Sequence, residues 1–340
     1  MHKTHLTGAL AVSALFLSAC TQATGPAGPT TPSSTREALR GRGQTSSMIY
    51  SVEEYGYSVN AYSPSANGNV APALQIAGSQ TKLYEPEGMA VDSAGNVAVA
   101  NSGQNITLYP AGANGNVAPM ATITCGGPDF GDEPYELAYD QNGALYALYV
   151  GGYHADVISI QVYEPGQQSG CIHGTHIITG NRVRLFGYGG LTVANGMIYN
   201  SSDDSIDGYH TSDNGNVSPA LVIRGSHTRL KQGMGMAVDA SGAIYVANRT
   251  NVLVFGPGAH GNVAPLAVIA GKKTGIPTGY GATAVTVDGS GEIFVAVENS
   301  QQVPAILVFA KGANGNATPI RTIQGASTGL TYIPEMGFKP

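Results

Sequence analysis

A seven-residue word that recurs along the chain constrains the fold more than any other feature. Its copies read ANGNVAP at residues 66–72 and 113–119, DNGNVSP at 213–219, AHGNVAP at 259–265 and ANGNATP at 313–319. Successive copies are 47, 100, 46 and 54 residues apart, so a degenerate copy is expected within the long interval, near residues 170–180. Repeats of this length are typical of solenoids, propellers and other arrays.

Each repeat unit contains four short segments with the pattern of β-strands. In residues 234–271, the runs MGMAVD, AIYVAN, NVLVF and LAVIAG are separated by turns rich in Gly, Pro and Asn. No stretch carries a sustained apolar period of 3.6 residues, so no substantial helix is expected. Four strands in a unit of this length predict one blade of a β-propeller.

The first strands of six units can be counted along the chain. They begin near Gly88, Glu136, Gly190, Met234, Ala282 and Met336. The sixth unit ends at Pro340, and its missing strands match residues 48–52, 57–62 and 73–78. We therefore expect an all-β, six-bladed β-propeller over residues 48–340, closed by one C-terminal strand and three N-terminal strands in a single blade.

The repeated sequence pattern of the blades resembles that of the NHL-repeat family of six-bladed propellers. The clearest copies are PEGMAVDSAGNVAVAN at residues 86–101 and GMAVDASGAIYVAN at residues 235–248. The resemblance implies the fold over residues 48–340. It implies no single activity, because propellers of this kind serve as lyases, lactonases, sensors and binding platforms.

Two recurring patterns are interpreted as structural. The seven-residue word is expected to connect the third and fourth strands of a blade, with Gly and Asn in the turn and Pro protecting the outer strand. The pattern Asp-x-x-Gly recurs at Asp92, Asp140, Asp239 and Asp288, where each Asp is expected to bond its own turn. The functional alternatives are calcium-binding repeats for the word and catalytic residues for the aspartates.

The N-terminus has the features of a bacterial lipoprotein. Residues 1–19 form a short basic and apolar signal peptide that ends in the lipobox Leu17-Ser18-Ala19-Cys20, with Cys20 as the expected lipidated residue. Residues 20–47 are rich in Thr, Pro, Gly and Ser and are expected to form a disordered tether. This predicts a membrane partner through the lipid anchor and a cell-envelope location, on the periplasmic or outer-membrane side in a Gram-negative organism.

Charge and composition limit the classes of partner. The net charge of −6 argues against a nucleic-acid partner, which would need a basic surface. No phosphate loop or nucleophile elbow is present. The propeller amidating lyases hold zinc through histidines on inner strands, and no His of the mature chain lies on an expected first strand.

Six polar residues are expected near the mouth of the central channel. Glu87, Glu136 and Glu335 start first strands, whereas Glu53, Asn101 and Asn248 end second strands. Converging carboxylate and amide oxygens suit a divalent cation such as calcium, and the alternative is solvated loop acids with hydrogen-bonded strand ends. Glu136 is displaced by one repeat position from Glu87, so these side chains need not point alike.

These observations favour a non-catalytic binding or interaction module, for which we name no catalytic residue, metal ligand or cofactor. The expected ligand is an unidentified envelope protein or glycan that binds the variable loops around the mouth. The alternative is a divalent-metal-dependent enzyme resembling a lactonase or a lyase. Cys125 and Cys171 are expected to stay unpaired, since they are placed at opposite ends of outer strands in neighbouring blades.

Overall fold

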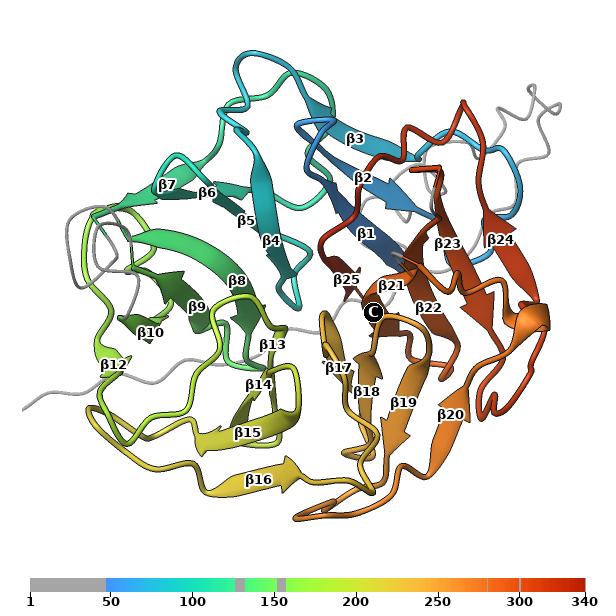
Figure 1. Ribbon diagram of the computed structural model, residues 1–340. Coiled ribbons are helices and arrows are strands. Elements are labelled where there is room, and N and C mark those ends of the chain that lie inside the picture. Colours follow the sequence, from blue (N-terminus) through green and yellow to red (C-terminus); the bar gives the residue numbers. More distant parts are fainter. Residues whose placement is uncertain (1–46, 126–131, 152–156, 280, 300, 340) are drawn as a thin grey trace, which may run out of the picture. The chain divides into compact units, whose positions relative to one another are not determined.

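The computed structural model describes residues 47–125, 132–151, 157–279, 281–299 and 301–339. The signal peptide, Cys20 and residues 20–46 of the expected tether lie outside these residues. Within them, the chain forms six sheets arranged as the blades of a propeller ring (Figure 1). The only helical element in these segments is the short 3₁₀ turn η1 (Lys272–Thr274), and no helix there is long and apolar enough to cross a membrane.

Blades 1 to 3 each present four antiparallel strands from the channel outward. Blade 1 comprises β4 (Pro86–Val91), β5 (Val97–Asn101), β6 (Asn105–Tyr109) and β7 (Ala121–Thr124). Blade 2 comprises β8 (Glu133–Tyr139), β9 (Leu145–Val150), β10 (Ile158–Tyr163) and β12 (His176–Ile178). Blade 3 comprises β13 (Leu191–Ala194), β14 (Met197–Ser201), β15 (Ser205–His210) and β16 (Leu221–Arg224).

Blades 4 to 6 repeat this order, and blade 6 joins the two ends of the domain. Blade 4 comprises β17 (Met236–Val238), β18 (Ile244–Ala247), β19 (Val252–Phe255) and β20 (Ala267–Ile269). Blade 5 comprises β21 (Gly281–Val287), β22 (Ile293–Glu298), β23 (Pro304–Phe309) and β24 (Arg321–Ile323). Blade 6 comprises β25 (Met336–Lys339), β1 (Met48–Glu53), β2 (Ser58–Tyr62) and β3 (Leu74–Ala77).

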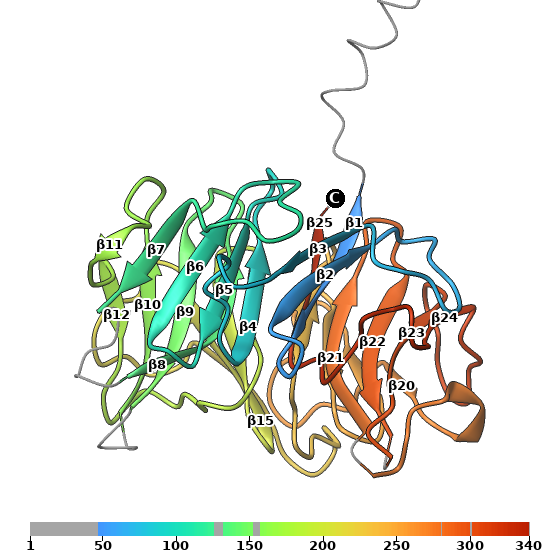
Figure 2. The same ribbon diagram turned by 90° about the horizontal axis from the view of Figure 1, so that it is seen from above.

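The predicted closure of the ring is confirmed. The C-terminal strand β25 pairs antiparallel with β1, with Phe338 opposite Ile49. The Val52 N–H also donates to the Glu335 carbonyl oxygen at 3.2 Å. Figure 2 shows β25 and β1 next to each other, with the start of β1 and the C-terminus at the same face of the ring. A single sheet therefore holds both ends of the domain.

Aromatic side chains close the hydrophobic core between blades. Each third strand has a fully buried ring at or next to its end, namely Tyr62, Tyr109, Tyr163, Tyr209, Phe255 and Phe309. A buried phenol needs a hydrogen-bond partner, and the Tyr62 hydroxyl donates to the Thr328 carbonyl oxygen at 2.6 Å. The hydroxyls of Tyr62, Tyr109 and Tyr209 thus fix three of the loops that lead from one blade into the next.

The Asp-x-x-Gly pattern forms the turns between first and second strands, as predicted. In blade 4, Asp239 Oδ1 accepts from the N–H groups of Ser241 at 2.9 Å and Ala243 at 3.0 Å. Gly242 has a φ of 88°, which favours glycine at this position. In blade 3, the turn is the two-residue Asn195-Gly196, both with positive φ.

The seven-residue word is structural, but its role extends beyond the blade that contains it. In blade 1, Gly115 forms an isolated parallel bridge with Ile76 of the preceding blade, and the Gly115 N–H donates to the Gln75 carbonyl oxygen at 2.6 Å. The Oδ1 of Asn114 accepts from the Gln75 N–H at 3.0 Å. The word therefore covers the outer edge of the neighbouring blade, which would otherwise be open to other chains.

A glycine–asparagine pair completes the contact at five of the six seams between blades. The Asn that follows the Gly of each word accepts the backbone N–H of the neighbouring blade's exit loop, as Asn116 does from Gln80 at 2.7 Å. A glycine with a φ between 122° and 130° lies beneath it, and an added Cβ there would lie 2.5–2.6 Å from the Asn side chain. The pairs are Gly78–Asn116, Gly180–Asn216, Gly225–Asn262, Gly271–Asn316 and Gly325–Asn69.

The sixth seam corrects the prediction that Cys125 and Cys171 stay unpaired. They form a disulfide with a Cα–Cα distance of 5.0 Å. The prediction was wrong because Cys171 does not belong to the edge of its own blade. It lies in β11 (Gly170–Cys171), which pairs in parallel with β7 of blade 1, with Cys171 opposite Thr124. This is the expected degenerate copy of the word.

A candidate binding site at the channel mouth

One face of the ring, here called the mouth face, carries the loops between blades and the loops between second and third strands. Buried side chains at the ends of second strands hold these loops in place. Asn101 accepts from the Tyr84 N–H at 3.0 Å, and Asn248 accepts from the Lys231 N–H at 2.6 Å. Glu53 accepts from the Thr331 N–H at 2.5 Å in the corresponding loop of blade 6. These three candidate residues therefore position the mouth loops.

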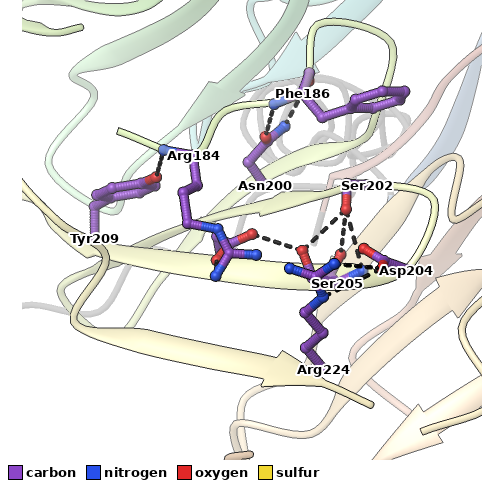
Figure 3. A network of polar contacts seen from close by, with 9 residues as sticks. Arg184, Phe186, Asn200, Ser202, Asp204, Ser205, Tyr209 and Arg224 are labelled. Atoms are coloured by element: carbon purple, nitrogen blue, oxygen red, sulfur yellow. Dashed lines mark hydrogen bonds and ion pairs between the residues drawn. The ribbon is translucent and has the colours of Figure 1, made fainter. Parts of the chain in front are cut away.

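Blade 3 shows how such a loop is fixed (Figure 3). Asn200 accepts from the Phe186 N–H at 2.7 Å and donates to the Phe186 carbonyl oxygen at 3.2 Å. The Arg184 N–H donates to the Tyr209 hydroxyl at 2.8 Å. These contacts hold the backbone on both sides of Leu185, so that the Phe186 ring is presented at the mouth.

A pocket of about 310 Å³ opens on the mouth face beside this loop. Its lining combines aromatic and apolar side chains with a cation and an anion, including Phe186, Tyr188, Met234, Tyr332, Arg249 and Asp203. The Arg249 guanidinium is oriented by its Nε–H, which donates to the Gly279 carbonyl oxygen at 3.0 Å. Concave sites with apolar walls and a few fixed polar groups are typical of ligand-binding pockets.

Exposed aromatic rings continue from the pocket around the mouth. Tyr332 stacks on Tyr55 with ring centroids 5.8 Å apart, and Tyr188 packs edge-on against Tyr135 at 5.2 Å. The side chains of Tyr55 and Tyr188 are 67% and 61% exposed. Large exposed aromatics that are held rigidly by neighbours are typical of interaction surfaces.

The structure brings Glu136 and Glu335 together, although they lie in blades 2 and 6. Each precedes the channel-lining part of its first strand at a matching position, and both are only 5% exposed. The two carboxyl groups lie close enough for each to shift the pKa of the other. The Oε2 atom of each receives no hydrogen bond from any donor group in the described chain.

Gly88 of the intervening blade 1 makes this approach feasible. A Cβ at Gly88 would lie 2.2 Å from the Tyr135 carbonyl oxygen and 3.1 Å from Glu136 Oε2. Such distances exclude a side chain at this position. The glycine therefore leaves the space through which a carboxyl from blade 2 reaches one from blade 6.

Burial dominates the electrostatics of the pair. It raises the pKa of Glu335 to about 8, and it raises the pKa of Glu136 well above the usual range, with further increases from the charges of Glu335 and Glu87. Burial also raises the pKa of Glu87 to about 7, assisted by Glu54, Glu133 and Glu85. These carboxyls therefore lie close enough to repel one another.

Below the pair, the central channel contains a cavity of about 260 Å³. All six first strands line it, and its lining surface is more polar than apolar. Glu335 is the one carboxyl-bearing lining residue, and Met89, Leu137 and Met336 are among the apolar ones. The pair thus separates the acidic part of the mouth from the channel. On the other side of the ring, the mouth loops of blades 3 to 5 carry the exposed cations Arg229, Lys231, Lys272 and Lys273.

A further hollow of about 230 Å³ lies on the opposite face, among the first turns of blades 2 to 4. Its carboxylates, Asp140 and Asp239, already accept backbone N–H groups of their own turns. The described residues contain no group of three or more His, Cys, Asp or Glu side chains arranged to hold a metal ion. The mouth face therefore has the stronger candidate site.

Sequence reasoning identified the glutamates but not the aromatic pocket. Phe186, Tyr188 and Tyr332 lie in loops that do not follow the repeat, so no periodicity marks them. The only signal was that the mouth loops differ between blades while the opposite turns keep nearly the same wording. Parts of two of these loops, residues 126–131 and 152–156, lie outside the described residues.

Comparisons with known proteins support the fold and leave the activity open. No protein-family model matches the chain, and no curated protein matches it. A Bacteroides caccae protein of unknown function superposes with a TM-score of 0.61 at 7% identity, over 86% of this chain and 99% of that chain. The WD40 β-propeller domain of Doa1 superposes with a TM-score of 0.51 at 12% identity, over 82% and 79% of the two chains. The protein is a six-bladed β-propeller.

Proposed function

We propose that this protein is a lipid-anchored, NHL-like propeller that serves as a binding module in the cell envelope. The lipobox that ends at Cys20 supports the anchor. The partner is an envelope protein or glycan, and the mouth face binds it. The aromatic pocket beside Phe186, Tyr188 and Tyr332 is the observation on which the proposal rests.

The repeated words and the mouth loops differ in the roles of their side chains. Around the outside of the ring, the repeated words cover the outer edges of neighbouring blades, and their Asn side chains are used in those seams. On the mouth face, fixed loops present rings that are more than half exposed, such as Tyr55 and Tyr188. A rigid scaffold that displays variable loops around a concave surface suits recognition.

The pocket can be tested with the full-length protein purified in detergent and immobilised on beads. We expect it to retain one or more components of a solubilised envelope extract or of a glycan library. The double variant Tyr188→Ala/Tyr332→Ala should lose that component, because it removes two aromatic walls of the pocket. The matched control is Leu266→Ala, which alters a 73% exposed apolar side chain just before β20, the outer strand of blade 4.

The outcome is decided by the difference between the two variants. Loss of the same component in Leu266→Ala, or its retention in the double variant, would exclude the pocket as the binding site. The anchor needs a separate test, in which Cys20→Ser is expected to abolish membrane fractionation. A Cys20→Ser variant that stays with membranes after a high-salt wash would disprove lipidation.

A further inference from the structure

The Glu136–Glu335 pair has the features of a specific cation site rather than of a structural contact. Two buried carboxyls meet across Gly88, and two of their oxygen atoms lack any donor from the described protein. Buried polar atoms are nearly always hydrogen-bonded, because leaving one unsatisfied costs about 1–3 kcal/mol. Two such atoms at the end of a channel are available to an external donor that competes with the carboxyl protons.

We propose that the Glu136–Glu335 pair binds the ammonium head of a primary alkylamine, either a free amine or a lysine side chain of the partner. The proposal rests on the mouth face being the binding face and adds the chemistry of the ligand. An ammonium group has three donors. The two free Oε2 atoms accept two of them, which satisfies both carboxyls at once.

Charge at the mouth would guide such a ligand to the pair. Glu54, Glu85 and Glu133 surround Glu87 on the same side of the mouth, and none of them is in a salt bridge in the described chain. A cleft lined by charges of one sign raises the local concentration of the opposite ion. The rings of Tyr135 and Tyr332 lie among these carboxyls and offer cation–π contacts along the way.

An alkylammonium ion fits this site better than a metal ion does. A hard cation such as calcium takes 6–8 oxygen ligands, whereas the described residues offer no metal-binding group of three or more His, Cys, Asp or Glu side chains. The channel cavity next to Glu335 has room for a short aliphatic stem, which would contact Met89, Leu137 and Met336. The carboxyl pair would hold the ammonium head, and the cavity has room for the stem.

Binding must depend on pH because it competes with protons. The groups that face the pair are Glu87 on β4, Tyr135 on β8 and Tyr332 in the loop before β25. Burial raises the pKa values of both carboxyls well above the usual range, so an ammonium ion that binds near neutral pH displaces a proton. For one displaced proton, the affinity should fall about tenfold per pH unit wherever the carboxyl is protonated in the free protein.

Isothermal titration calorimetry on the full-length protein in detergent tests this directly. The probes are n-butylammonium, N-acetyl-lysine methylamide, tetramethylammonium and Ca²⁺, each measured at pH 6, 7 and 8 in two buffers of different ionisation enthalpy. We expect at least one of the primary amines to bind, with release of about one proton, and tetramethylammonium to bind at least tenfold more weakly. Binding of n-butylammonium alone would identify a free amine, and binding of the lysine derivative would identify a protein side chain.

Glu136→Gln and Glu335→Gln should each weaken amine binding at least tenfold. Glutamine keeps the size of a protonated glutamate, and thermal unfolding of each variant checks that the fold is kept. The control is Glu164→Gln, which changes a carboxyl on the opposite face. Tighter binding of Ca²⁺ than of either amine, or equal amine binding by all variants, would disprove the inference. If Glu136→Gln still retains the envelope partner in the pull-down, the partner binds the mouth face without using the amine site. The proposed function would then hold although the amine site is not part of it.

Discussion

Cys125 and Cys171 occupy the positions that glycine and asparagine hold at the other five seams of the ring. Cys125 follows Ile123 by two residues, as Gly78 follows Ile76, and Cys171 follows Gly170 as Asn116 follows Gly115. One seam therefore replaces a hydrogen-bonded contact between blades by a covalent bond. An oxidising compartment is where such a bond would persist, which agrees with the proposed envelope location.

Reduction of this disulfide should lower the free energy of unfolding. The bond closes a sequence separation of 46 residues, for which the loss of chain entropy in the unfolded state corresponds to about 4 kcal/mol. The double variant Cys125→Gly/Cys171→Asn restores the pair used at the other seams, so its stability should not respond to reductant. Urea unfolding with and without reductant measures both quantities, and a wild-type protein that is indifferent to reductant would contradict this role.

The glycines of the five non-covalent seams should not tolerate alanine. At Gly180, which has a φ of 123°, an added Cβ would lie 2.6 Å from the Asn216 carboxamide. We expect Gly180→Ala to cost more than about 2 kcal/mol, through both backbone strain and the clash. Gly112→Ala is the matched control, because Gly112 also has a positive φ of 76° but has open space around it.

A double-mutant cycle separates the two causes. Asn216→Ala removes the clashing side chain, so the combined variant should be less destabilised than the sum of the single changes. Chemical denaturation of the three variants gives the coupling energy. Strict additivity would show that Gly180 and Asn216 do not act as a pair.

The fold could be predicted from the sequence because its determinants are local. Alternating strands, Gly- and Asn-rich turns and a constant repeat length identify blades, and the C-terminal position of β25 indicates how the ring closes. The seams could not be predicted, because they join a loop of one blade to the outer edge of another. Cys171 was therefore assigned to its own blade, although it pairs beside Thr124.

The candidate site could be predicted from the sequence only in part, for a similar reason. The sequence places Glu136 and Glu335 at the starts of first strands, but their meeting depends on Gly88 of a third blade. Their matching register became visible only with β8 and β25 placed in the ring. Tyr188 and Tyr332 lie in non-repeating loops, where no pattern distinguishes a binding residue from a variable one.

Stability should fall as the pH rises through neutrality, and Glu53 should account for part of this loss. Burial raises its pKa from 4.5 to about 7, although Ser51, Thr331 and Asn60 hydrogen-bond it and partly oppose the shift. A raised pKa stabilises the folded state fully below pH 4.5, and the contribution is lost as the pH rises through 7. The shift corresponds to about 3 kcal/mol.

Glu53→Gln should remove this part of the pH dependence. Glutamine mimics the protonated acid and keeps an acceptor for the Thr331 N–H. Urea unfolding at pH 5, 7 and 8.5 should show a smaller decline for the variant than for the wild type, by about 3 kcal/mol. The pair Glu136–Glu335 contributes with the same sign in both proteins. Parallel pH curves would show that Glu53 is not protonated in the folded state.

The C-terminal strand should control the integrity of the whole ring. Removal of residues 331–340 deletes β25, the innermost strand of blade 6, together with the Thr331 N–H that Glu53 accepts. The β1 strand would lose its inner partner, and the neighbouring first strands β4 and β21 would lose the strand that lies between them. Unpaired strand edges promote association with other chains.

We expect this truncation to unfold or aggregate, whereas deletion of residues 21–45 should leave the melting temperature unchanged. Size-exclusion chromatography and thermal unfolding of the two truncations provide the comparison, and equal melting temperatures would contradict a ring that depends on β25 for closure.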